Sequence, residues 1–149
     1  MQTIAVFVND VAAASRVMQP LLAGSAAPTR WIVVACPPVL TRHIGRWVSQ
    51  AARRQWRERF GAELFAALVP ALARPAGAAV ETIVATRPLV SVAARLQARW
   101  PGLQLLDARQ ARVGRTDEPI VAGQPVSQAD WTAPAAATAG LTLVLTLAD

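Results

Sequence analysis

The chain has 149 residues, of which 54% are hydrophobic, and a net charge of +6; its basic residues are all arginines, with no lysine and no tyrosine. This length suits a single domain, 1–149, with a substantial core, and the lack of lysine excludes a Walker-type phosphate loop and Schiff-base catalysis. No apolar run approaches the roughly 18 to 20 residues of a spanning helix, no signal-peptide pattern opens the chain, and the single Cys36 agrees with a reducing compartment. We therefore expect a cytoplasmic protein without a membrane segment.

Short apolar runs rich in β-branched residues alternate with helical patterns along most of the chain. The runs predict strands at 4–8, 31–35, 80–84, 103–106 and 141–145. Helical patterns cover 11–22, 41–74 and 88–100. Such alternation is typical of crossover units and a parallel sheet. We therefore predict an α/β fold with one open, mostly parallel, five-stranded sheet and helices on both faces.

The region 41–74 is the longest helical pattern and is rich in arginine. Near its start, Arg46, Arg53 and Arg57 fall on one stripe of a 3.6-residue period, and Trp47 falls on the opposite, apolar side. That spacing places Trp47 in the core. Past Phe60 the apolar side rotates, so we expect the helix to contact two surfaces, the sheet and a partner subunit, or to bend near Gly61.

The pattern weakens between 108 and 139, which contains several prolines and glycines. Residues 120–122 are the one candidate for a short edge strand there, and loops of this length are usually functional or mobile. The last apolar segment, 141–147, alternates, so its two faces differ, as expected for a strand at a sheet edge or a subunit interface.

The side chains needed for familiar catalysis are scarce. His43 is the only histidine and has no obvious carboxylate beside it, and Cys36 fits a buried thiol that ends the second strand. No group of residues has metal-ligand spacing, and no two acids on one element form a pair for general acid–base work. We therefore predict a protein that is not an enzyme and holds no metal, with no catalytic residue to name.

Parallel sheets bind ligands at the carboxyl ends of their strands, near the point where the strand order reverses. Asn9 and Asp10 follow the first predicted strand, and Asp10 also suits the N-cap of the next helix. Asp107 and Arg109 follow the fourth. If a ligand binds, we expect it beside these four residues, although packing and capping explain Asp10 about as well.

The order of elements resembles the universal stress protein family. The matching segments are 4–10 followed by Ser15, 80–88 ahead of a helix, and 103–109 at the fourth strand. The resemblance implies a five-stranded sheet and a homodimer formed through 141–147. Members that bind ATP carry an acidic residue after the first strand, where Asn9 or Asp10 stands here. They also carry a Gly-x2-Gly-x9-Gly-Ser/Thr signature after the fourth strand, which Gly114 and Gly123 do not reproduce.

These observations predict a stress-response or regulatory protein with a degenerate nucleotide crevice. It would bind ATP weakly, carry no resident cofactor, and act through a protein partner. The alternative is a module that binds nucleic acid or another polyanion through the arginine-rich helix 42–59, since arginines neutralise phosphates and tryptophans stack on bases. A charged helical stripe is more often a solvated face.

Overall fold

The computed structural model describes residues 1–24, 27–40, 42–86, 88–110 and 118–122. The elements in these ranges are, in chain order, β1 (Gln2–Val8), α1 (Val11–Gly24), β2 (Thr29–Ala35), α2 (Arg42–Gly45), α3 (Gln50–Leu72), β3 (Ala79–Val84), α4 (Leu89–Arg99) and β4 (Gln104–Asp107). The predicted strand at 141–145 and the alternating segment 141–147 lie outside the described residues.

The described strands form one parallel sheet in the order β3-β2-β1-β4. β1 pairs with β2 from Gln2↔Thr29 to Val8↔Ala35, and with β4 from Ile4↔Gln104 to Phe7↔Asp107. β2 pairs with β3 on its other side. The chain therefore adds strands on one side of β1 first and on the other side later, which places the topological switch point between the ends of β1 and β4. The parallel α/β architecture predicted from the sequence is confirmed, with four strands in the described part of the chain.

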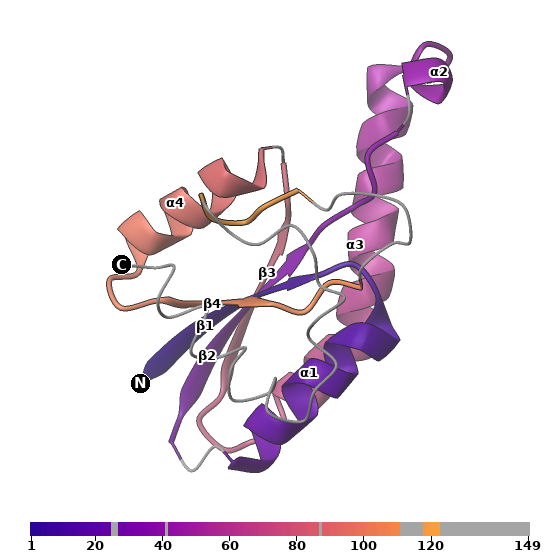
Figure 1. The fold of residues 1–149 in the computed structure, drawn as a ribbon. Coiled ribbons are helices and arrows are strands. Elements are labelled where there is room, and N and C mark those ends of the chain that lie inside the picture. Colours follow the sequence, from indigo (N-terminus) through magenta and orange to yellow (C-terminus); the bar gives the residue numbers. More distant parts are fainter. Residues whose placement is uncertain (25–26, 41, 87, 111–117, 123–149) are drawn as a thin grey trace.

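Successive residues of each strand face two separate cores, because strand side chains alternate between the two faces of a sheet. Val6, Val33 and Leu106 belong to the core that α1 and α3 cover. Phe7, Val34 and Leu105 belong to the other core, which α4 covers. Figure 1 shows α4 on one side of the sheet and α1 and α3 on the other. β1 from Ile4 and β2 from Trp31 are buried on both faces, as the continuous apolar runs of a parallel sheet require.

The predicted continuous helix over 41–74 is wrong between α2 and α3. The chain leaves the helix after Gly45, and α3 starts again with Ser49 as its N-cap, whose Oγ accepts a hydrogen bond from Ala52 N–H at 3.1 Å. A serine cap satisfies one of the unpaired N–H groups of the first turn, so Ser49 begins a new helix rather than continuing the old one. Gly61 does not interrupt α3, which is helical from Gln50 to Leu72.

α3 extends well past the carboxyl edge of the sheet, toward α2 (Figure 1). Its buried residues, Gly61, Leu64, Leu68 and Leu72, all belong to its second half, which packs on the sheet. None of the residues from Gln50 to Phe60 is buried. We call α2, residues 46–49 and the first half of α3 the arm; residues 37–40 run beside it.

Candidate functional site

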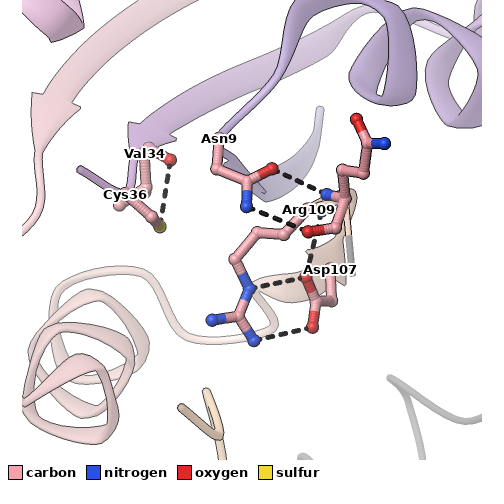
Figure 2. Close-up of polar contacts among 6 residues, drawn as sticks. Asn9, Val34, Cys36, Asp107 and Arg109 are labelled. Atoms are coloured by element: carbon pink, nitrogen blue, oxygen red, sulfur yellow. Dashed lines mark hydrogen bonds and ion pairs between the residues drawn. The ribbon is translucent and has the colours of Figure 1, made fainter. Parts of the chain in front are cut away.

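Three of the four residues predicted from strand ends come together at the switch point. Asn9 follows β1, and Asp107 and Arg109 lie at and just after the end of β4 (Figure 2). The strands are joined there by the hydrogen bond from Ala108 N–H to the Phe7 carbonyl at 2.9 Å. The carboxyl ends of parallel strands meet at one edge of the sheet, so Asn9, Asp107 and Arg109 lie close together, as the sequence predicts.

Asn9 clamps the segment after β4 to the end of β1. Its Oδ1 accepts a hydrogen bond from Gln110 N–H at 2.6 Å, and its Nδ2 donates to the Gln110 carbonyl at 3.1 Å. The side-chain amide thus pairs with a backbone peptide group as a neighbouring strand residue would. Both polar atoms of the Asn9 side chain are engaged in this contact.

Asp107 and Arg109 form a largely buried ion pair. Arg109 Nε donates to Asp107 Oδ1 at 2.9 Å, and Arg109 Nη2 donates to Asp107 Oδ2 at 3.0 Å. The Arg109 side chain is only 5% exposed and the Asp107 side chain 10% exposed. Arg109 N–H also donates to Asp107 Oδ1 at 3.2 Å. This parallel two-bond geometry is the strong form of an arginine–carboxylate contact. The positive charge of Arg109 is therefore balanced by its neighbour.

Asp10 serves the adjacent helix. Ala13 N–H donates to Asp10 Oδ2 at 2.9 Å, and Ala14 N–H donates to the Asp10 carbonyl at 3.1 Å. The carboxylate caps α1 and complements the partial positive charge of its N-terminus. The N-cap role predicted for Asp10 is confirmed, and none of its described hydrogen bonds reaches Asp107 or Arg109.

Glu118 is a residue that the sequence analysis missed. Its Oε1 accepts a hydrogen bond from Leu89 N–H, the first amide of α4, at 2.8 Å. Pro88, at the N-cap position, makes no side-chain cap bond, so Glu118 supplies the cap from 29 residues further along the chain. The next apolar residue, Ile120, is buried in the core under α4. The predicted edge strand at 120–122 is wrong, because these residues form a bend and a turn.

A cleft of about 420 Å³ opens at the carboxyl ends of β2 and β3, away from the switch point. One wall is the segment 37–40, and Ala85, just past β3, also lines the cleft. The other wall comes from the arm, with Gly45, Arg46, Arg53, Trp56 and Arg57. The stripe formed by Arg46, Arg53 and Arg57 in the sequence thus faces a cleft.

Trp47 lies on the surface of the arm, which corrects its predicted place in the core. It is 84% exposed, because the chain turns at 46–49 and carries Trp47 off the apolar side of a continuous helix. Ile44 and Val39 are also more than half exposed. The arm and the adjacent segment 37–40 therefore expose apolar side chains beside the arginines of the arm.

The remaining chemistry-bearing residues stand apart from one another. His43 is exposed on α2. Cys36 is buried just after β2, as predicted, with Sγ 3.6 Å from the Val34 carbonyl that accepts from it (Figure 2). Within the described ranges, no three histidine, cysteine, aspartate or glutamate side chains gather where they would hold a metal ion.

No described helix combines the length and apolarity needed to cross a membrane.

Comparison with known proteins gave no match: no family model, no curated protein and no solved structure is significantly similar to this chain. Function must therefore be argued from the geometry of the chain itself.

Proposed function

We propose that this protein is a non-catalytic regulatory domain resembling universal stress proteins, with a nucleotide crevice that has become degenerate. The parallel order β3-β2-β1-β4 supports the resemblance, since it creates a switch point where such domains would hold a ligand. The observation that carries the proposal is that the polar groups at this point bond to one another. Asn9 is paired with Gln110, and Asp107 with Arg109.

A phosphate placed at the switch point would meet unfavourable electrostatics. It would have to compete with Asp107 for the Arg109 guanidinium, and it would lie close to the Asp107 carboxylate, which repels it. Removing one member of a buried ion pair leaves an uncompensated charge, which is strongly unfavourable. These contacts disfavour a phosphate at the switch point, and they therefore support the proposal that ATP binds only weakly.

The same proposal includes a cytoplasmic location, a homodimer formed through 141–147, and action through a protein partner. The alternating pattern of 141–147 and the resemblance support the dimer. The described side chains form no familiar catalytic group, and we therefore propose that the domain acts by binding a protein partner.

Native mass spectrometry of freshly purified protein, followed by calorimetric titration with ATP and Mg²⁺, tests this function. We expect a dimer without retained nucleotide, and a Kd for ATP weaker than about 1 mM. Retention of an adenine nucleotide that is lost in Asn9→Ala would contradict the degenerate crevice. A monomer would contradict the dimer. Gln2→Ala, near the other end of the same strands, is the control for a general effect on the pairing of β1 with β4.

A second candidate function is binding of a nucleic acid or another polyanion along 42–59. The exposure of Trp47 favours it, because an indole on the surface can stack on a base while neighbouring arginines contact phosphates. Fluorescence anisotropy with a single-stranded oligonucleotide tests it. We expect Trp47→Ala and Arg54→Gln each to weaken binding, with affinity falling steeply as salt rises. Equal affinity of both variants and the unchanged protein would exclude this function.

A further inference from the structure

The cleft beside the arm is a separate feature from the switch point. The switch point lies between the ends of β1 and β4, whereas the cleft lies beyond the ends of β2 and β3. Its volume of about 420 Å³ falls within the range of small-molecule sites, roughly 300 to 1,000 Å³. It is therefore large enough for a compact organic ligand.

Among the described residues that line the cleft, the charged ones are all cationic. Arg46 contributes from the turn after α2, and Arg53 and Arg57 contribute from α3. The described lining includes no acidic side chain. Three guanidinium groups around one opening favour an anionic group, and their planar forks match the oxygens of a phosphate.

Arg53 is held in place by the arm itself. Its Nη2 donates a hydrogen bond to the Gly45 carbonyl, which ties α2 to α3. The Arg53 guanidinium lies against Gly45, since a Cβ there would be in van der Waals contact with Nη2 at 3.4 Å. Arg53 Nε is buried and has no hydrogen-bond partner in the described structure. A buried donor without an acceptor is unfavourable, so an acceptor supplied by a ligand would satisfy it.

The rest of the cleft is largely apolar. Its inner surfaces come from Pro37, Pro38, Val39, Leu40 and Ala85, with Trp56 on the helical side. The prolines have no N–H group to offer a polar ligand. Small-molecule sites commonly combine such apolar walls with a few polar groups that orient the ligand. The ligand that fits has a charged end and an apolar or aromatic body.

We propose that this cleft binds a small phosphorylated molecule, with its phosphate held by Arg46, Arg53 and Arg57 and its apolar or aromatic body against Trp56 and residues 37–40. The proposal goes beyond the function above, because it concerns another site and does not depend on the state of the switch point. It also differs from polyanion binding, since a strand of nucleic acid would use arginines outside the cleft as well.

Calorimetric titration of the full chain with phenyl phosphate, inorganic phosphate and phenol tests the proposal. We expect one phenyl phosphate per chain, with a Kd below about 1 mM, and affinity at least about fivefold higher than for inorganic phosphate. We expect phenol to bind far more weakly than phenyl phosphate. Arg57→Gln should weaken phenyl phosphate binding by about tenfold or more.

The matched control is Arg54→Gln, three residues before Arg57 on the same helix but not part of the cleft lining. We expect it to change affinity by less than about twofold. Arg46→Gln provides a second cleft variant on another segment, and circular dichroism establishes that each variant is folded. Trp56→Leu should lower the advantage of phenyl phosphate over inorganic phosphate while leaving inorganic phosphate binding nearly unchanged.

Two results would overturn the proposal. One is no detectable binding of phenyl phosphate up to about 20 mM. The other is equal loss of affinity in Arg54→Gln and Arg57→Gln, because the general positive field of the arm would then account for binding. Because ATP also carries phosphates and an aromatic body, variants separate the two sites: ATP binding that is lost in Asn9→Ala but kept in Arg57→Gln belongs to the switch point, and the reverse pattern belongs to the cleft.

Discussion

Gly61 of α3 lies directly against Val84 of β3: a Cβ built on Gly61 would stand 2.6 Å from Val84 Cγ2. The side chain of Phe65 comes within 3.3 Å of the same point. A glycine at this position lets the helix approach the edge strand of the sheet closely. The sequence pattern around Gly61 is compatible with a bend, but the physical role of this glycine is close packing within an unbroken helix.

Gly61→Ala should therefore destabilise the protein, although alanine normally favours a helix by about 1 kcal/mol over glycine. We expect a loss of about 1 to 3 kcal/mol, since overpacking forces neighbouring atoms to move. Chemical denaturation measures the difference. The matched control is Gly24→Ala in α1, where no atom of the described residues lies within 4 Å of the added Cβ. Equal or greater stability of Gly61→Ala would contradict the close packing.

Asn9→Ala should lower the free energy of unfolding by about 1 kcal/mol, because it removes two hydrogen bonds to the backbone N–H and C=O of Gln110, an exposed residue whose groups can then bond to water. Gln2→Ala is the control. Gln2 Nε2 donates to Gln104 Oε1 at 2.8 Å near the other ends of the same two strands, as a single bond between side chains that engages no backbone group. We expect its loss to cost less than about 0.5 kcal/mol. Equal losses of unfolding free energy in the two variants would show that the Asn9 hydrogen bonds stabilise the protein no more than the Gln2 hydrogen bond does.

Asp107→Ala should be the most damaging of these substitutions. It leaves the Arg109 guanidinium buried without its carboxylate, and we expect a loss of about 3 to 5 kcal/mol in urea denaturation. The double variant Asp107→Leu with Arg109→Met removes both charges and should recover part of that loss. For comparison, Glu81→Gln disrupts the more exposed pair between Glu81 and Arg99, which should contribute less than about 1 kcal/mol. A double variant that is less stable than Asp107→Ala in urea denaturation would refute this account.

Glu118→Ala should weaken the start of α4 by about 1 kcal/mol, the usual contribution of a helix cap. Glu118→Gln keeps an oxygen acceptor but loses the charge, so we expect an intermediate effect. Hydrogen exchange of the first amides of α4, read together with thermal unfolding, measures both changes. Glu63→Ala, on the exposed side of α3, is the control. Unchanged exchange at Leu89 in Glu118→Ala would disprove the cap.

The periodic parts of the fold could be predicted from the sequence. The runs beginning at Ile4 and Trp31 are buried on both faces, and this produces an unmistakable strand pattern. The strand-end rule also placed Asn9 near Arg109, because it depends only on the order of strands. In each case, local pattern and tertiary packing favour the same answer.

The details that were missed depend on contacts between distant segments or on competing local signals. Trp47 matches the period of a continuous helix, and only the new N-cap at Ser49 reveals that the helix restarts. The partner of Asn9 is a backbone group 101 residues away, which no side-chain pattern encodes. Glu118 likewise caps a helix that lies well before it in the chain. Such pairings become visible only once the fold is known.

The extension of α3 beyond the sheet divides this helix into two parts of unequal stability. Its second half is anchored by Leu64, Leu68 and Leu72, whereas its first half has no buried residue. Local opening requires little free energy where few apolar contacts are broken. The arm can therefore fray and re-form while the sheet stays intact. Exposed residues along 50–59 can likewise be substituted with little effect on folding, so the surface of the arm can change while the fold of the sheet is kept.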